Sequence, residues 1–465
     1  MNKAQNYFLC GIGGSGMLPL ALILKAAGHH VEGSDRALDQ GRTAPKFDYL
    51  RAQGVRLHPQ NGGGLVSPDQ ILVTSAAVEE TVPDVVAARR LGAKRMTRAE
   101  LLAALFNDAP RPVGVAGSSG KSTTTAMIAW ILHEAGRDPT VMNGAVMKNF
   151  AAPDAPFASA RVGLSGIFVS EVDESDGSIA LFRPRVAALN NIALDHKTMD
   201  ELRRLFSDFV ARAETAVLNL DNEETARLAA AREGAAITYS LSGRNARLFA
   251  SDIRLAPYGA VFTAHDRERG AEARVTLKMP SRHNVSNALA AVGASLACGV
   301  SFEEAASALD SFAGVKRRLE VVGEKNGVTV IDDFAHNPDK IAASLAALHE
   351  FPGRLLVMFQ PHGYGPLKKM KEEFIRCWAE NLCTEDMLVM PEPVYFGGTV
   401  DRSVTSRDIA EGVAAAGRRA QALPDRDACK ALILREARED DRIVIMGARD
   451  DTLTLFAVEL LGEFA

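Results

Sequence analysis

Short apolar runs alternate with longer segments of helical period from the start of the chain. The first pair is an apolar strand at Tyr7–Cys10 and, after a Gly-rich turn, an apolar helix at about Leu18–Ala27. The next strand ends at Asp35, a buried strand is expected at Gln70–Ser75, and a helix at Pro83–Leu91. Strand and helix patterns that alternate at this pitch predict a parallel sheet with helices on its faces.

The alternation continues through the rest of the chain. A strand at Pro112–Ala116 leads through a Gly-rich loop into an apolar helix at Ser122–Ala135. Residues 236–280 differ, because short alternating runs such as Ala273–Leu277 predict an antiparallel insertion. The other expected strands are Ile167–Ser170, Val186–Leu189, Ala216–Leu218, Leu319–Val322, Thr329–Ile331, Arg354–Phe359, Met387–Met390 and Arg442–Met446. The other expected helices are Asn284–Cys298, Phe302–Phe312, Asp339–His349 and Lys368–Asn381.

The length of the chain calls for more than one domain. Its 465 residues exceed what one hydrophobic core usually holds. The pattern of elements separates into three blocks, and we expect three α/β domains in series at residues 1–109, 110–313 and 314–465. No repeats or coiled-coil heptads interrupt this series.

Composition narrows the class of protein. Charged residues make up 24% and hydrophobic residues 47% of the chain, which is ordinary globular composition. The net charge of −5 gives no basic footprint for nucleic acid. The first residues lack a signal-peptide pattern, and no uncharged apolar run approaches the roughly 20 residues of a membrane span. We therefore expect a cytoplasmic protein without nucleic-acid or membrane partners.

The five cysteines are scattered and form no C-x-x-C pair, which predicts free thiols. Cys377 and Cys383 lie six residues apart near a tryptophan. We interpret both as buried structural cysteines, with a redox or metal role as the alternative.

The strongest local signal for chemistry is the loop Gly117-Ser118-Ser119-Gly120-Lys121-Ser122-Thr123. Glycines let backbone N–H groups face phosphate oxygens, and the following helix adds its positive end. Lys121 then reaches the β- and γ-phosphates, and Ser122 or Thr123 supplies an oxygen to Mg²⁺. Val115 stands where the general G-x-x-x-x-G-K-[ST] pattern has its first glycine. A plain Gly/Ser turn before a helix is the alternative, and it leaves the adjacent Lys-Ser-Thr unexplained.

A second glycine loop, Gly11-Ile12-Gly13-Gly14-Ser15-Gly16-Met17, lies between the first strand and helix. Asp35 closes the next strand, where an acidic residue meets a ribose hydroxyl in dinucleotide-binding folds. Alone, this pattern suggests a dinucleotide-dependent oxidoreductase. Two phosphate-binding loops in successive domains fit better with one phosphorylated substrate and one ATP.

Polar clusters follow several other predicted strands. Glu171–Asp176 offers carboxylates for Mg²⁺ at a strand end, with a solvated acidic loop as the alternative. Asp195-His196 follows another strand end and adds an imidazole. Arg282–Asn287 is either a helix cap or a base-binding segment, and Lys316–Arg318 either surface charge or a phosphoryl-stabilising group. Asp332–Pro338 follows a strand of the third block.

In this order, the motifs resemble the Mur ligases of peptidoglycan synthesis, and in particular those that act on UDP-N-acetylmuramate itself. The resemblance runs over nearly the whole chain. The matching stretches are Gly11–Met17, Gly33–Asp35, Gly117–Thr124, Glu171–Asp176, Asn191–His196, Arg282–Ala288, Lys316–Arg318, Asp332–Pro338 and Phe359–His362. The collinear set is far more specific than any one member.

The resemblance implies a Rossmann-like domain that binds the UDP moiety, a central P-loop ATPase-type domain and a Rossmann-like C-terminal domain. It also implies an ATP-dependent ligase that joins a carboxylate to an amino acid amine through an acyl phosphate. The default substrates are UDP-N-acetylmuramate and L-alanine. The expected cofactors are ATP and Mg²⁺, and the expected assembly is a monomer or homodimer.

Site residues carry over by position. The expected catalytic residues are Lys121, His196, Arg318, His336 and His362. The expected ATP-binding residues are Gly117, Ser118, Ser119, Gly120, Lys121, Ser122, Thr123, Asn284, Asn287, Arg318 and Asp333. The expected substrate-binding residues are Gly13, Gly14, Ser15, Gly16, Met17, Ser34, Asp35 and Ser75. The expected metal ligands are Ser122, Glu171 and His196.

The chain departs from the family pattern mainly at the acceptor side. Ser118-Ser119 replaces Thr-His in the phosphate loop, and Phe334 and Asn337 replace Tyr and His. The family's R-Y-x-R after Q-P-H reads Gly363-Tyr364-Gly365-Pro366, without the arginine that grips an amino acid carboxylate. An amide ligase with a different acid or amine is therefore the alternative. Retention of Lys121 argues against a catalytically silent homologue.

Overall fold

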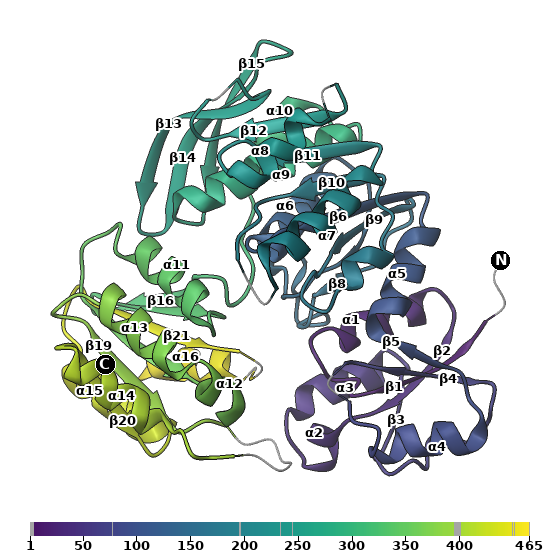
Figure 1. Cartoon of the computed structure of the whole chain (residues 1–465), viewed down its shortest axis with the longest axis horizontal. Coiled ribbons are helices and arrows are strands. Elements are labelled where there is room, and N and C mark those ends of the chain that lie inside the picture. The colour runs from purple at the N-terminus through teal and green to yellow at the C-terminus, as the bar shows by residue number, and fades with distance from the viewer. Residues whose placement is uncertain are drawn as a thin grey trace. The chain divides into compact units, whose positions relative to one another are not determined.

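The computed structural model describes residues 4–76, 78–194, 197–232, 234–243, 245–394, 401–448, 450 and 452–464 (Figure 1). These residues form three sheets and divide into two compact units. One unit runs to Leu255 and includes 260–278 and 282–315, and the other holds 256–259, 279–281 and the chain from Lys316. Within the described residues, no helix combines the length and apolar character that a bilayer crossing requires.

The first sheet is parallel and has the strand order β3-β2-β1-β4-β5. The connections that follow the adjacent strands β1 and β4 run toward opposite edges of the sheet. This arrangement is a topological switch point, where open parallel sheets bind ligands at the carboxyl ends of their strands. The strands are β1 (Asn6–Cys10), β2 (His30–Ser34), β3 (Arg56–His58), β4 (Gln70–Thr74) and β5 (Arg95–Thr97). The helices are α1 (Met17–Ala26), α2 (Arg36–Asp39), α3 (Ala44–Ala52), α4 (Pro83–Leu91) and α5 (Arg98–Asp108).

The second sheet has the order β15-β14-β13-β12-β11-β10-β6-β9-β7-β8. Its central strand β6 pairs in parallel with β9 on one side and β10 on the other. The strands are β6 (Arg111–Ala116), β7 (Thr140–Met142), β8 (Ala160–Arg161), β9 (Ile167–Glu171), β10 (Val186–Leu189), β11 (Thr215–Asn219), β12 (Ala236–Ser240), β13 (Leu248–Ala256), β14 (Gly259–Asp266) and β15 (Ala271–Leu277). The helices are α6 (Lys121–Glu134), α7 (Met199–Ala211), α8 (Glu223–Ala230), α9 (Arg282–Ala297) and α10 (Phe302–Leu309), with short 3-10 turns η1 (Lys148–Phe150) and η2 (Ser178–Leu181).

The predicted antiparallel insertion is continuous with this sheet. Strand β12, at the start of the predicted segment, pairs in parallel with β11 and β13. Farther along, β14 is a neighbour of β13 and pairs with β15 in antiparallel register. Residues 236–240 therefore belong to the parallel part of the sheet, which alternation within a short strand cannot reveal.

The third sheet has the order β16-β17-β21-β18-β19-β20, and β16 alone among its described strands runs antiparallel to its neighbour. Successive side chains of a strand point to opposite faces. Accordingly, Val357 and Phe359 enter the core under α11, α13 and α14, whereas Leu356 and Met358 enter the core under α15 and α16. The strands are β16 (Glu320–Lys325), β17 (Val328–Asp333), β18 (Leu355–Gln360), β19 (Met387–Pro391), β20 (Arg419–Leu423) and β21 (Arg442–Gly447). The helices are α11 (Pro338–Leu348), α12 (Tyr364–Lys369), α13 (Lys371–Asn381), α14 (Ser406–Ala415), α15 (Arg426–Glu436) and α16 (Thr452–Glu463).

The predicted three-domain α/β architecture is confirmed, while its domain boundaries stay a prediction. One expected helix differs in detail: the segment predicted at 368–381 is two helices, α12 and α13. Met370 separates them, with φ −114° and ψ 27° outside the helical range. Helix α12 also starts earlier than expected, after Gly363 at φ 147°.

Substitution of Gly33 by alanine tests the packing of the first sheet. A Cβ at this buried position on β2 would lie 2.5 Å from the Leu9 carbonyl oxygen and 2.8 Å from Ile12 Cδ1. We expect Gly33→Ala to lower the free energy of unfolding by about 1–3 kcal/mol, as overpacking usually does. Calorimetry of the full chain measures the change. Gly462→Ala, where no atom lies within 4 Å of the added carbon, is the control and should leave stability unchanged or slightly higher. Equal stability of the two variants would contradict the close approach.

Candidate functional site

The glycine loop after β6 has the backbone that a phosphate loop needs. Gly117 and Gly120 adopt φ of 135° and 80°, which side-chain-bearing residues rarely reach. A Cβ on Gly120 would lie 2.5 Å from Asn287 Oδ1 and 2.7 Å from Asn190 Nδ2. Helix α6 then begins at Lys121 and runs for 14 residues, so that its N-terminal N–H groups and dipole favour an anion beside the loop.

The two serines of the loop are anchored to the segment after β10. The N–H of Ser118 donates to the Asn191 carbonyl at 3.1 Å, and the N–H of Ser119 donates to Asn191 Oδ1 at 3.0 Å. Ser118 Oγ also exchanges hydrogen bonds with the backbone of Ala193, both at 2.9 Å. The expected ATP contacts of Ser118 and Ser119 stay a prediction, and in this structure their backbone N–H groups hold the loop in shape.

Lys121 lies beside the loop among acidic side chains. Its Nζ donates to the Gly117 carbonyl at 2.7 Å and forms an ion pair with Glu174 at 3.0 Å. Burial lowers the pKa of Lys121, but the carboxylates of Glu174, Glu171 and Asp173 outweigh it and raise the pKa above its ordinary value. The lysine therefore stays charged, and an entering phosphate competes with Glu174 for it.

Beside Lys121, the hydroxyl of Ser122 donates to Glu171 Oε2 at 2.8 Å, and the Gly144 N–H donates to the same oxygen at 3.0 Å. The structure thus brings together two of the predicted metal ligands, from the start of α6 and the end of β9. Hydroxyl and carboxylate oxygens are the donors that Mg²⁺ prefers, so this set fits the ion. The third predicted ligand, His196, lies outside the described residues together with Asp195.

Glu174 and Asp173 complete the acidic loop and were not singled out from the sequence. Burial raises the pKa of Glu174 above its usual range. Burial also acts to raise the pKa of Asp173, but Lys121 and hydrogen bonds from Ser175 outweigh it and hold the pKa low. The cluster of four acidic residues in the sequence indicated a charged site. Which of these residues contacts Lys121 depends on the turn at 173–178.

Asparagines from α9 and β10 line the other side of the loop. Asn287 Nδ2 donates to Asn284 Oδ1 at 3.2 Å, and Asn190 Nδ2 lies 3.3 Å from Asn287 Oδ1. Asn190 Nδ2 also donates to Thr124 Oγ1 at 2.9 Å. The two asparagines predicted to bind ATP are therefore brought to the phosphate loop. Asn190, which links Thr124 of α6 to Asn287 of α9, was not identified from the sequence. Its position at the end of a strand could have indicated it.

The first glycine loop lies at the switch point between β1 and β4. The N–H of Gly13 and that of Ala37 each donate to one oxygen of Asp35, both at 2.8 Å. The Asp35 carboxylate therefore fixes the loop and caps α2. Gly14 and Ser15 are exposed at the tip, and Met17 begins α1, so the helix N-terminus faces the same edge.

Beneath this loop lies a buried carboxylate that the sequence did not reveal. Asp84, in the first turn of α4, accepts hydrogen bonds from the Ser34 hydroxyl and, at 2.9 Å, from the Gly62 N–H. Ser34 is thus oriented by Asp84, while Ser75 follows β4 at the same edge. An acid in the first turn of a helix usually signals only a favourable dipole interaction, which hid this role.

The predicted groups of the third domain are fixed by their own unit. Asp333 accepts from the Leu319 N–H at 3.0 Å and from the Ser344 hydroxyl at 2.6 Å. The Arg318 guanidinium lies 4.6 Å from the Phe334 ring centroid, within cation–π range. Arg317, its neighbour, forms a buried ion pair with Asp332 at 3.3 Å.

The predicted histidines of this domain lie together. The rings of His336 and His362 are 5.2 Å apart and edge to face. His336 Nδ1 lies 3.0 Å from the Phe334 carbonyl, which can only accept, so Nδ1 carries the proton and Nε2 is an acceptor. Burial and the nearby Lys340 lower the pKa of His336 to about 3. The imidazole is therefore neutral at physiological pH.

Three known families match successive segments of the chain. They are "Mur ligase family, catalytic domain" at residues 7–109, "Mur ligase middle domain" at 115–295 and "Mur ligase, glutamate ligase domain" at 317–449. A UDP-N-acetylmuramate–L-alanine ligase of Desulforapulum autotrophicum is 33% identical over 96% of both chains. One of Synechococcus sp. (strain JA-3-3Ab) is 40% identical over 84% of this chain and 74% of the relative.

The chain belongs to the Mur ligase family.

Solved structures agree on the fold of this Mur ligase. A UDP-N-acetylmuramate–alanine ligase of Thermotoga maritima superposes with a TM-score of 0.78 at 23% identity, covering 98% of each chain. A murein peptide ligase of Psychrobacter arcticus gives a TM-score of 0.74 at 25% identity, covering 99% of this chain and all of that one. Like other members of its family, the protein is an ATP-dependent amide ligase.

The depressed pKa of His336 predicts how stability depends on pH. Because the folded pKa lies below the unfolded value near 6.5, the neutral ring stabilises the fold above pH 6.5. This contribution is lost as the pH falls toward 3, at up to about 1.4 kcal/mol per pH unit. We expect His336→Asn to flatten the loss of stability over this range, measured by urea unfolding at a series of pH values. A titration of His336 near pH 6.5 in histidine NMR spectra would contradict this.

Proposed function

We propose that this Mur ligase joins the lactyl carboxylate of UDP-N-acetylmuramate to the amine of L-alanine, with ATP converted to ADP and phosphate. The observation that carries the proposal is Lys121, held charged at the N-terminus of α6 beside a glycine loop. Ser122 and Glu171 add an oxygen set suited to Mg²⁺. The curated relatives named above, at 33% and 40% identity, supply the default substrates.

The reaction follows from the chemistry of a poor leaving group. A carboxylate oxygen of the sugar attacks the γ-phosphorus of ATP, ADP leaves, and an acyl phosphate forms. The amine nitrogen then attacks the acyl carbon, phosphate leaves, and the amine loses a proton. Lys121 and the N–H groups of α6 offset negative charge on the phosphoryl oxygens. Mg²⁺, when bound, neutralises further charge on the phosphates.

His336 is suited to positioning the amine rather than to removing its proton. A base with a pKa of about 3 is a weak proton acceptor at neutral pH. Its Nε2 lone pair nevertheless accepts a hydrogen bond from an N–H group. We therefore propose that His336, with His362 beside it, orients the amine. We propose that Arg318 and Asp333 contact the nucleotide.

The first glycine loop is assigned to the nucleotide sugar. Residues Gly14 to Met17 lead into the start of α1, where an anion is favoured. Arg98 lies next to this loop, because a Cβ added to Gly16 would approach its Cδ to 2.9 Å. A cytoplasmic location and a monomeric or homodimeric state remain predictions from the sequence.

A second candidate is favoured by one feature of the acceptor side. The stretch Gly363–Leu367 after His362 holds no arginine, so no bidentate partner for a free amino acid carboxylate comes from it. An amine whose carboxylate is already in a peptide bond does not need that partner. The second candidate is therefore ligation of a recycled peptide to the same sugar, the role implied by the name of the Psychrobacter arcticus murein peptide ligase.

Removal of Lys121 tests the phosphate loop. We expect Lys121→Ala to reduce ADP release by at least about a hundredfold, the usual order for loss of one transition-state donor. A coupled ADP assay with UDP-N-acetylmuramate and L-alanine measures the rate. Lys94→Ala, at an exposed lysine of the first domain, is the matched control and should keep the wild-type rate. Undiminished ADP release from the Lys121 variant would refute the mechanism.

An amine panel separates the two candidates. A charged hydrogen bond is worth about 1.5–3 kcal/mol. We therefore expect the KM for L-alanine to be about 10–100-fold higher than in a ligase that has the arginine. Pro366→Arg, which restores arginine in α12, should lower that KM and leave the KM for an L-alanyl peptide unchanged. Steady-state rates of ADP release at fixed UDP-N-acetylmuramate give both constants. A clear preference of the unmodified protein for the peptide would select the second candidate.

A further inference from the structure

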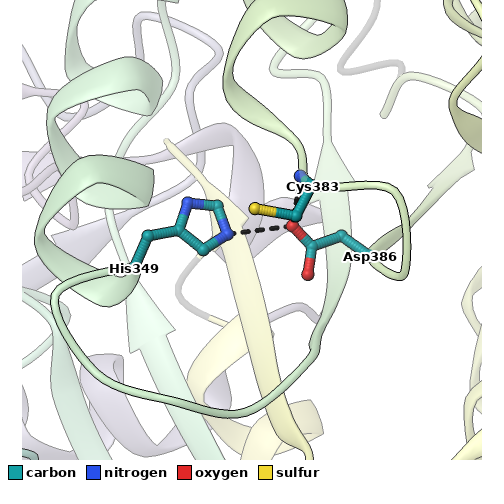
Figure 2. Close-up of side chains that lie close together, drawn as sticks. All are labelled: His349, Cys383 and Asp386. Atoms are coloured by element: carbon teal, nitrogen blue, oxygen red, sulfur yellow. Dashed lines mark hydrogen bonds and ion pairs between the residues drawn. The ribbon is translucent and has the colours of Figure 1, made fainter.

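A cluster of His349, Cys383 and Asp386 lies in the third domain, outside the groups assigned to ligation. His349 caps the end of α11, and the other two belong to the turn between α13 and β19 (Figure 2). One ligand-type atom of each residue lies within 4.8 Å of the other two. His349 Nε2 is 2.9 Å from Asp386 Oδ2. The three side chains thus converge from two separate segments.

The turn itself holds its two side chains in place. The N–H of Cys383 donates to Asp386 Oδ2 at 2.7 Å, and the N–H of Asp386 donates to the Cys383 carbonyl at 3.2 Å. Asp386 Oδ1 accepts the Leu355 N–H at 2.8 Å, so this buried carboxylate is fixed by three elements. The C-x-x-D spacing presents both side chains on one side of a turn, as C-x-x-C does in zinc sites.

Cys383 corrects an expectation from the sequence. It was interpreted as a buried structural cysteine, whereas the structure leaves it exposed. Cys377, six residues earlier, is buried as expected. Helix α13 ends at Asn381, and the turn that follows carries the Cys383 thiol to the surface beside an imidazole and a carboxylate. Its position is that of a ligand open to solvent.

We propose that His349, Cys383 and Asp386 form a zinc-binding site with one open coordination position. Thiolate, imidazole and carboxylate are the ligands of Zn²⁺, and a thiolate disfavours Mg²⁺ and Ca²⁺. The thiolate and carboxylate together balance a divalent charge. Tetrahedral zinc holds neighbouring ligand atoms about 3.3–3.8 Å apart. On binding, the 2.9 Å contact between His349 and Asp386 therefore opens slightly, and any pair near the 4.8 Å limit closes by about one ångström. Exposed Cys383 leaves the fourth position to water.

Binding changes protons in a defined way. The Cys383 thiol releases its proton, and the ion takes the place of the hydrogen that His349 shares with Asp386. The proton that the neutral His349 ring carries on Nε2 is lost to solvent, Nδ1 takes up a proton from solvent, and Nε2 coordinates the ion. The ion links the end of α11 to the turn before β19, and it stabilises the folded state by mass action. The alternative is a His–Asp hydrogen bond with no metal.

Cobalt provides the test, because a thiolate bound to Co²⁺ gives a near-ultraviolet charge-transfer band and tetrahedral Co²⁺ gives intense visible bands. We titrate the chelator-treated full chain with Co²⁺. The expected result is a saturable thiolate band that Zn²⁺ removes and that excess Mg²⁺ does not. Cys383→Ser should abolish the band and weaken Zn²⁺ binding at least about tenfold. Cys298→Ser, at a partly exposed cysteine outside the cluster, is the matched control and should keep the band.

The outcomes are decisive because Cys383 is exposed and its replacement by serine leaves the turn intact. Absence of a thiolate band in the unmodified chain overturns the proposal. So does a band that survives Cys383→Ser or disappears in Cys298→Ser. His349→Gln provides a second test. Unchanged circular dichroism would show that the variant is folded, and its Co²⁺ complex should lose the visible bands of tetrahedral coordination. Retention of those bands would exclude the imidazole as a ligand. None of these results depends on ligase activity, so they stand apart from the proposed function.

Discussion

The candidate site depends on one constraint, namely that β9, β6 and β10 run side by side in the same direction. Their carboxyl ends therefore meet at one edge of the second sheet, and each is followed by a different chemical group. The glycine loop and α6 follow β6, the acidic loop follows β9, and Asn190 and Asn191 follow β10. Without this parallel order, Lys121 would be buried without the carboxylates that keep it charged, which is costly.

The same edge explains why the loop tolerates its unusual serines. Family members carry Thr-His where this chain has Ser118-Ser119, and the imidazole is therefore missing. The backbone of both serines is held by Asn191, which belongs to the next strand's loop rather than to the glycine loop. These backbone contacts do not require a particular side chain at the two positions, whereas the Ser118 hydroxyl adds two hydrogen bonds to the Ala193 backbone.

The sequence predicted most of the fold because apolar runs report burial directly. The helix at Pro83–Leu91 and the strand at Val186–Leu189 have the predicted bounds. The parallel pairing of β12 and the break at Met370 between α12 and α13 were not predictable, since periodicity reports neither strand direction nor the backbone angles of one residue. The sequence located the acidic cluster but not the contact of Glu174 with Lys121, which joins residues 53 positions apart. Asp84 beneath the first glycine loop and the exposure of Cys383 likewise depend on tertiary packing.

The ion pair between Lys121 and Glu174 has a further consequence for ligand choice. In the free protein the positive charge of Lys121 is already paired with the Glu174 carboxylate, so a small anion gains little by displacing that carboxylate and leaves it buried without a partner. A nucleotide bound with a divalent cation would compensate both groups, because its phosphate would pair with Lys121 and its cation with the released carboxylate. We therefore expect the resting pair to favour a metal-complexed triphosphate over free phosphate or sulfate.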